Sequence, residues 1–157
     1  MLKATRRPGW FKISYDVAED GRHVTVLAAR DRTSFAFSAH AIPYIAVMVT
    51  RAEFALYCPR GIVANARRQS WRRWFAQTSA GTLELVRPSL LLQTWELRQD
   101  GRAIAVFEAQ AHGGPLPHTA TVPDYMPLHE RLFLFSMVLT LWLRASPASI
   151  ADQVISS

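Results

Sequence analysis

The stretch RLFLFSMVLTLWLR, residues 131–144, lies near the end of the chain and carries no charge between its two terminal arginines. Its apolar side chains occupy every face of a helix, which is typical of a helix surrounded by protein. The twelve residues between the arginines would rise about 18 Å as α-helix, against about 30 Å for a bilayer core. We therefore predict a buried core helix; a membrane span is the alternative.

Glycines in turn-like contexts recur at even spacing through the rest of the chain. They stand in EDGR, PRGI, SAGT and QDGR, at Gly21, Gly61, Gly81 and Gly101. The last three follow one another at intervals of 20 residues, and the first precedes them by 40. Asp-Gly between alternating runs is a strong hairpin signal because such turns need a positive φ. Two strands and two turns fill one interval, which indicates a long antiparallel meander.

Apolar residues alternate along the flanks of these turns. Phe11, Ile13, Tyr15 and Val17 share one face of a strand, and the pair LLLQTWEL and RAIAVFEA forms the last hairpin. The stretch AIPYIAVMV, residues 41–49, fits either a strand or a short helix. A central helix that is apolar all round needs a wall, and closing the meander supplies one without exposed edges. Pro127 and Pro147 flank the helix on either side.

The predicted fold class is mainly β (α+β): an antiparallel meander closed into a barrel of about twelve strands around one hydrophobic C-terminal α-helix. We predict a single domain over residues 1–157, with a core at about 9–145 and tails at 1–8 and 146–157. At 157 residues the chain is long enough for one sizeable core.

The order of these elements resembles a known family. A strand such as HTATVPDY, then prolines, then a strongly apolar terminal helix, preceded by hairpins of the type ELRQDGRAIAVFE, is similar to the tubby C-terminal-like superfamily, which includes the LURP-one-related proteins and the phospholipid scramblases. The likeness covers about residues 10–144 and is one of pattern and order. It implies a twelve-stranded barrel around a central helix and, more loosely, association with phosphoinositide or other phospholipid.

The chain carries a net charge of +6, and nearly all its basic residues are arginines. This balance indicates an anionic partner such as a phospholipid surface, a nucleic acid or an acidic protein. Arginine suits bidentate phosphate contacts, although a biased genome would give the same excess. Cys58 is the one cysteine, so the sequence predicts no disulfide framework. With no apolar segment after the basic start, we expect a cytoplasmic protein, or one peripheral at the inner face of the membrane.

A basic and aromatic segment is the strongest candidate for a ligand site. It contains Arg60, Arg67, Arg68, Arg72 and Arg73 together with Trp71 and Trp74, and residues 54–83 hold no acidic side chain. As a helix, it would suit a membrane interface. As two strands that meet near Gln69 and Ser70, which we prefer, it would project its arginines at a turn. Either arrangement could hold the phosphate of a lipid or of a single-stranded nucleic acid.

The competing interpretation of this segment is purely structural. The arginines would keep a barrel edge soluble, and the tryptophans would pack inward. A smaller basic patch, formed by Lys3, Arg6, Arg7 and Lys12, is expected to be a disordered arm.

Other residue types give weaker signals of chemistry. His112 and His118 are joined by a Gly/Pro-rich loop, so we expect loop histidines and no metal. We interpret His129 and Glu130 as a water-exposed pair at the start of the helix, and Cys58 as a buried structural residue. No nucleophile elbow, glycine-rich phosphate loop or paired-carboxylate motif is visible. We therefore predict a non-enzymatic protein without a cofactor.

Three hypotheses for function remain. The first is a barrel module that binds anionic phospholipid through the cluster at residues 60–73. The second is a single-stranded nucleic-acid binder that stacks bases on Trp71 and Trp74. The third is a protein-interaction scaffold with no small ligand. A fourth possibility is that the central helix leaves the barrel and enters a membrane.

Overall fold

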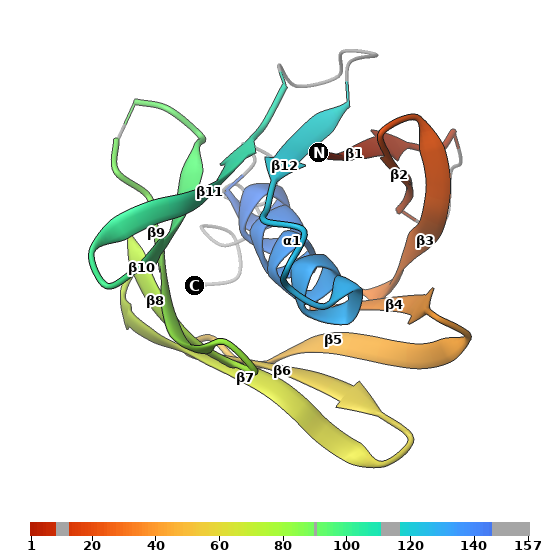
Figure 1. The fold of residues 1–157 in the computed structure, drawn as a ribbon, viewed down its shortest axis with the longest axis horizontal. Helices are drawn as coiled ribbons and strands as arrows, with labels where there is room; N and C mark the ends of the chain where they lie inside the picture. The colour runs from red at the N-terminus through yellow and green to blue at the C-terminus, as the bar shows by residue number, and fades with distance from the viewer. Residues whose placement is uncertain (9–12, 90, 111–116, 146–157) are drawn as a thin grey trace, which may run out of the picture.

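The computed structural model describes residues 1–8, 13–89, 91–110 and 117–145. In this part of the chain, twelve antiparallel strands form a closed barrel, and one helix runs through it (Figure 1). The strands are β1 Leu2–Arg6, β2 Ser14–Glu19, β3 Arg22–Asp31, β4 Ser34–Ala39, β5 Ile42–Thr50, β6 Glu53–Cys58, β7 Gly61–Ser70, β8 Arg73–Thr78, β9 Gly81–Val86, β10 Trp95–Gln99, β11 Arg102–Glu108 and β12 His118–Thr121, and the helix is α1 Leu128–Arg144. The predicted fold class is confirmed.

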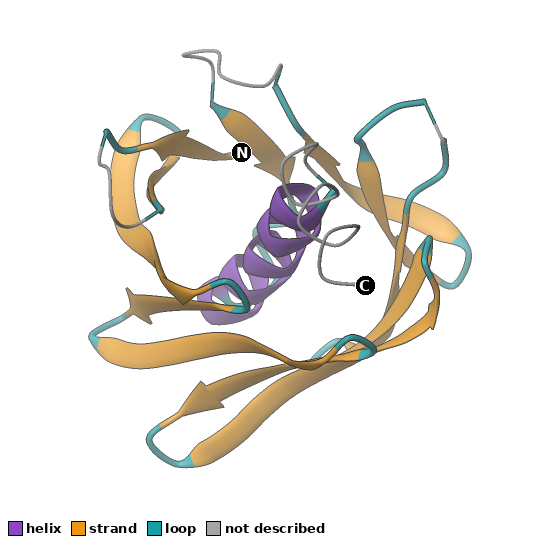
Figure 2. Ribbon diagram, turned by 180° about the vertical axis from the view of Figure 1, so that it is seen from behind, coloured by secondary structure: helices purple, strands orange, loops and turns teal. Residues whose placement is uncertain are grey.

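The helix α1 fills the centre of the barrel in both ribbon views (Figures 1 and 2). Every residue from 130 to 140 is buried, as expected for a helix that is apolar all round. Its two buried hydroxyls bond within the helix: Ser136 Oγ donates to Leu132 O and Thr140 Oγ1 donates to Ser136 O, both at 2.8 Å. The polar side chains therefore cost little inside an apolar core. Among the described residues, no helix is both long enough and apolar enough to cross a bilayer.

The N-terminal residues differ from the prediction, because most of the expected tail 1–8 is the strand β1. It pairs with β2 on one side and with β12 on the other, and so closes the barrel. Leu2 and Ala4 alternate with polar neighbours and point into the core, where each is 1% exposed. With only two inward side chains and no turn glycine beside it, the strand is too short to stand out in the sequence. Lys3 and Arg6 belong to it, so the expected disordered arm is wrong for them, and Lys12 lies outside the described residues.

Hairpin turns explain the regular spacing of glycines. Gly21, Gly61, Gly81 and Gly101 all have positive φ, between 77° and 123°, a region that costs glycine little. The gap between the first two is filled by another hairpin turn, in which Ala41 has φ 63°. Residues 42–50 form the strand β5, which decides between the two interpretations of that segment. The turns therefore repeat at every twentieth residue from 21 to 101.

These five turns lie together at one end of the barrel, because consecutive strands of a meander run in opposite directions. We call this the glycine end; α1 also begins here. The opposite end, which we call the arginine end, is formed by the turns 31–33, 51–52 and 71–72 and by the connection 87–94 between β9 and β10. The helix finishes at this second end, where Trp142 Nε1 donates to Gln93 O at 2.6 Å.

Candidate functional site

Three neighbouring hairpin tips at the arginine end share one construction. In each, a short polar side chain accepts a hydrogen bond from the backbone amide two residues further on, a turn that needs no glycine. A β-bulge precedes each tip. The three bonds are Thr33 N to Asp31 Oδ1 at 2.8 Å, Ala52 N to Thr50 Oγ1 at 3.2 Å and Arg72 N to Ser70 Oγ at 3.3 Å.

Backbone hydrogen bonds also connect each tip to the strand that follows its hairpin. The carbonyl of the second turn residue accepts the amide of a residue in or just after that strand. The bonds are Met48 N to Thr33 O at 2.7 Å, Arg68 N to Ala52 O at 2.9 Å and Arg87 N to Arg72 O at 2.8 Å. The tips are therefore fixed in a row along the rim, and the side chains of the turns are presented by a rigid backbone.

The predicted cluster at residues 60–73 is divided between the two ends of the barrel. Residues 61–70 form the strand β7, so the two-strand interpretation is confirmed, with the turn at Trp71 and Arg72. Arg60 precedes this strand of ten residues, which spans about 30 Å. It therefore lies at the glycine end, far from the other arginines, and including it in one site was wrong.

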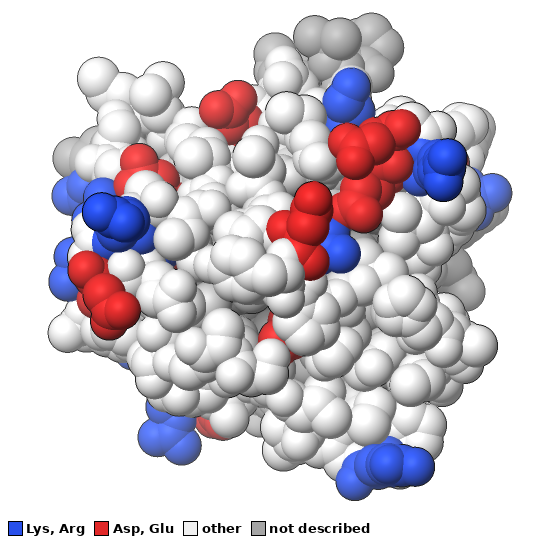
Figure 3. Space-filling view, in the orientation of Figure 1, with Lys and Arg blue, Asp and Glu red and all other residues white. Residues whose placement is uncertain are grey.

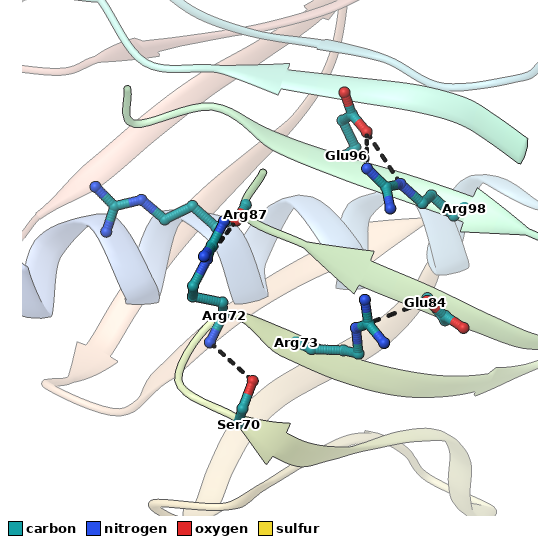
Figure 4. Close-up of polar contacts among 7 residues, drawn as sticks. All are labelled: Ser70, Arg72, Arg73, Glu84, Arg87, Glu96 and Arg98. Atoms are coloured by element: carbon teal, nitrogen blue, oxygen red, sulfur yellow. Dashed lines mark hydrogen bonds and ion pairs between the residues drawn. The ribbon is translucent and has the colours of Figure 1, made fainter. Parts of the chain in front are cut away.

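Two arginines of the cluster have partners within the barrel wall (Figure 4). Arg72 Nε donates to Arg87 O at 3.0 Å, and its Nη2 donates to Pro88 O at 2.7 Å. Arg73 lies 3.9 Å from the carboxylate of Glu84, a surface pair that contributes little. The Arg72 side chain therefore ties the β7–β8 tip to the connection 87–94 and is not free to bind a ligand with its full set of donors.

Arg67, Arg68 and Arg51 have no such partners. All three are exposed, and within the described residues their side chains form neither an ion pair nor a hydrogen bond. Arg51 belongs to the tip 51–52, whose Ala52 carbonyl binds the amide of Arg68. Unpaired guanidinium groups on adjoining segments keep all their donors available for an external phosphate or carboxylate.

The two tryptophans of the cluster have opposite environments. Trp74 is 1% exposed and packs edge-on against Phe54, with ring centroids 5.1 Å apart. It cannot stack on a base, so its assignment as a binding residue was wrong; strand alternation turns it inward. Trp71 is 57% exposed at the tip, and the guanidinium of Arg72 lies 5.7 Å from its ring centroid. Of the two indoles, only Trp71 faces solvent.

Charge is distributed unequally between the two ends. The arginine end carries Arg6, Arg7, Arg30, Arg32, Arg51, Arg67, Arg68, Arg72, Arg73, Arg87 and Arg144 against Asp16, Asp31, Glu53 and Glu108, whereas the glycine end carries Arg22, Arg60, Arg102 and Arg131 against Glu19, Asp20, Asp100, Asp124 and Glu130. The remaining charged side chains of the described residues, Lys3, Glu84, Glu96 and Arg98, lie between the two ends; Glu84 pairs with Arg73 and Glu96 with Arg98. The turn from β12 into α1 lies in front of the helix in Figure 1, so Figure 3 shows the glycine end, where acidic side chains gather near the centre and upper right. The positive charge of the protein is thus concentrated on the opposite rim.

Sequence reasoning missed several residues of this rim. Arg32, Arg51 and Leu91 lie at or beside the midpoints of the twenty-residue interval, at 31, 51, 71 and 91, where the turns of the second end must fall. Leu91 and Leu92 are 93% and 60% exposed in the connection 87–94, which Arg72 of the β7–β8 tip binds through Arg87 O and Pro88 O. The signal was available in the spacing, but no glycine marks these turns.

Two ionisable groups at this end have shifted pKa values. Hydrogen bonds from the backbone and hydroxyl of Thr33, and from Ser34, lower the pKa of Asp31, so this carboxylate stays charged as a turn-forming acceptor. Burial raises the pKa of Tyr15, and the positive charge of Arg6 partly opposes the shift. Neither group is poised for proton transfer near neutral pH.

The histidines and the start of the helix are more buried than predicted. Glu130 is 1% exposed and accepts hydrogen bonds from the backbone and the hydroxyl of Ser79, while His129 stacks on Tyr44 at 5.1 Å. Glu130 is therefore buried and His129 half-buried, because the β8–β9 turn packs against the first turn of α1. His118 begins β12 and packs against Trp142 at 5.0 Å, so it is not a loop residue.

The described part of the chain offers few other candidate sites for metal binding, catalysis or ligand binding. His112 lies outside it, Cys58 is half-buried, and no group of three His, Cys, Asp or Glu residues gathers as metal ligands in the ranges the structure covers. A shallow hollow of about 350 Å³ lies at the glycine end, bordered by Asn65, Gln77 and Glu130. Its acidic group is already bonded to Ser79 and Gln77 accepts a bond from Thr82, which leaves few groups for a ligand.

Comparisons of the chain with models of protein families, with characterised proteins and with solved structures gave no match.

Proposed function

We propose that the protein is a non-enzymatic barrel module that associates with anionic phospholipid, and that the arginine end is the surface that meets the membrane. The observation that carries this proposal is the row of three equivalent tips at 31–33, 51–52 and 71–72, which holds Arg51, Arg67, Arg68 and the exposed Trp71 on one rim. Positive charge spread over several tips of one rim suits a lipid surface.

The charge of the rim favours the inner face of a membrane. Anionic lipids give the cytoplasmic leaflet a negative surface potential, and each basic residue near it contributes about 1 kcal/mol. Indole side chains prefer the headgroup region. We propose the same location for this protein, at the cytoplasmic side and peripheral to the bilayer.

We also propose that the chain is a divergent relative of the tubby C-terminal-like superfamily. The support is architectural: twelve strands in chain order, prolines after the last strand, and a buried helix at the centre of the closed wall. Fold alone does not carry function, so the lipid proposal depends on the rim and not on this relationship.

Vesicle sedimentation with a matched pair of variants tests the lipid proposal. Arg51→Gln, Arg67→Gln and Arg68→Gln together remove three unpaired charges from the arginine end; Arg22→Gln, Arg60→Gln and Arg102→Gln remove three exposed charges from the glycine end. We expect the first variant to lose about 100-fold in affinity for phosphatidylglycerol-containing vesicles, since three residues at about 1 kcal/mol each are removed. The second should bind like the original protein, apart from long-range effects that salt screens.

Equal losses in the two variants would show that only net charge matters and would contradict the assignment to this rim. No sedimentation at low salt would overturn the lipid proposal itself. Stronger binding to single-stranded oligonucleotides than to vesicles, lost in Trp71→Ala, would favour the nucleic-acid hypothesis, while a stable protein complex with neither ligand bound would favour the scaffold.

A further inference from the structure

The described residues of the connection 87–94, namely 87–89 and 91–94, include apolar side chains exposed where polar ones are expected. Leu91 is 93% exposed and Leu92 60% exposed, and Val49 and Trp71 at the same end are also largely in solvent. Single exposed leucines are common. Two adjacent ones at the same end as an exposed indole, on a rim otherwise rich in arginine, are the pattern of an interaction surface.

This connection is held in place from several sides. Arg72 binds the carbonyls of Arg87 and Pro88, and Arg87 Nε donates to Leu92 O at 3.1 Å. On the opposite flank, Trp142 of the central helix binds Gln93 O at 2.6 Å. The leucines are therefore displayed by a braced loop and would lose little conformational freedom when they meet a partner.

We propose that Leu91, Leu92 and Trp71 form a hydrophobic anchor that enters the acyl boundary of an anionic bilayer, while the surrounding arginines bind lipid phosphate. This inference rests on the proposed function and adds a mode of attachment to it. Charge complementarity identifies an anionic bilayer as the partner. The cations Arg51 and Arg68 lie on adjoining segments of the same rim and would bind lipid phosphate at the headgroup level. The leucine and tryptophan side chains would then lie below them, in the acyl boundary.

Insertion predicts two contributions to binding with different salt dependence. The arginine contribution weakens as ions screen it, whereas the transfer of leucine side chains into hydrocarbon does not depend on attraction between charges. The complete protein should therefore keep residual binding to vesicles at high salt. Leu91→Gln with Leu92→Gln should lose that residual binding and lower the low-salt affinity about tenfold, equivalent to about 1.4 kcal/mol.

The matched control places the same change at the glycine end. Ile42 and Ile62 are 44% and 58% exposed there, so Ile42→Gln with Ile62→Gln makes the same number of apolar-to-amide changes at exposed positions away from the rim. This variant should bind vesicles like the original protein at both salt concentrations. Equal losses in the two double variants would overturn the inference.

A polarity-sensitive fluorophore reports the depth of the loop directly. The dye is attached through Leu91→Cys, in a protein that also carries Cys58→Ser, and a second preparation carries Ile62→Cys instead. With phosphatidylcholine–phosphatidylglycerol vesicles, we expect emission from the dye at position 91 to increase and shift to shorter wavelength, and no change from the dye at position 62.

The outcomes separate the two proposals. Sedimentation with vesicles but no response at position 91 overturns insertion and leaves the proposed function standing. A response at position 91 with neutral and anionic vesicles alike supports insertion and contradicts the anionic preference. A high signal without vesicles, together with a dimer in sedimentation velocity, shows that a second copy covers the leucines and overturns the inference.

Discussion

The two ends of the barrel are built on different principles. At the glycine end, five turns repeat every twenty residues, most of them with glycine at positive φ. There Glu130 bonds to Ser79, and Arg131 forms an ion pair with Glu19 of β2, so both side chains fasten the helix to the wall. At the arginine end, three tips contain no glycine and are held by the side chains of Asp31, Thr50 and Ser70. Thr78 makes the same kind of bond at the glycine end, but beside Gly81. The first end binds the start of the helix to the wall through buried Glu130; the second leaves the side chains of Arg51, Arg67 and Arg68 without partners among the described residues and exposes Leu91 and Leu92. The comparison indicates that one end maintains the fold and the other is available for binding.

The largest difference in stability should follow from Glu130→Ala. Its carboxylate accepts two hydrogen bonds from Ser79 in a buried position, and bonds to a charged group contribute about 1.5–3 kcal/mol each. We expect the free energy of unfolding to fall by about 3 kcal/mol, measured by urea denaturation. Arg51→Ala, at the other end, should stay within about 0.5 kcal/mol of the original protein. Similar losses at both positions would refute the division of roles.

A second prediction concerns backbone strain at the glycine end. Gly81 has φ 100°, and no atom lies within 4 Å of the place where a side chain would begin. Gly81→Ala should therefore lower the free energy of unfolding by about 1–2 kcal/mol through backbone strain alone.

The converse substitution at the same end serves as its control. Ala41 already has φ 63°, so Ala41→Gly should relieve strain and raise the free energy of unfolding by up to about 1 kcal/mol. Thermal unfolding of both variants measures the pair. If both substitutions lower the free energy of unfolding, positive φ at these turn positions does not determine the effect of the substitutions.

The bond between the helix and the leucine-bearing connection gives a third prediction. Trp142→Phe keeps a buried ring but removes the donor to Gln93 O, so the free energy of unfolding should fall by about 1 kcal/mol. Amide hydrogen exchange should increase in the connection 87–94 and stay unchanged at the tip 51–52. Increased exchange throughout the barrel would show a global effect and contradict a local brace.

The smallest effect should be a pH dependence confined to one tip. Hydrogen bonds from Thr33 hold the pKa of Asp31 below its unfolded value of about 3.9. Its stabilisation is therefore present above that value and is lost as pH falls through the lowered folded value. Because Asp31 is exposed, we expect Asp31→Asn to cost less than about 1 kcal/mol at pH 7, and the difference from the original protein to shrink as the solution is acidified below about pH 4.

The neighbouring tip supplies the comparison. Thr50 holds an equivalent turn with a hydroxyl group that does not titrate. The cost of Thr50→Ala should therefore not change with pH. An identical pH profile in the two variants would assign the effect to another group.

The fold was predictable because its signals repeat. Residues 131–144 have no polar face, and glycines at 61, 81 and 101 set the period of the wall, so the barrel with a central helix follows from local rules. The strand β1 was missed because Leu2 and Ala4 give too short an alternation, and its place is decided by distant pairing with β12.

The candidate site was less predictable because it is assembled from separate tips. Closeness in sequence grouped Arg60 with Arg72, whereas the ten-residue strand β7 places them at opposite ends. Arg51 and Leu91 are distant in sequence from residues 60–73, and only the folding of the meander brings them to the same rim. Inward and outward positions also depend on register, which turned Trp74 into the core and left Trp71 outside.

The seam between β1 and β12 has a consequence for synthesis of the protein. Among the described elements, β1 is synthesised before the strands it must join, its partner His118–Thr121 is the last of the twelve, and the helix that fills the interior follows later still. A nascent chain therefore carries an open, curved sheet with an empty apolar lining and two unsatisfied edges for most of its translation. Such an intermediate is prone to pairing with other chains, so we expect this protein to depend on ribosome-associated chaperones until α1 is released.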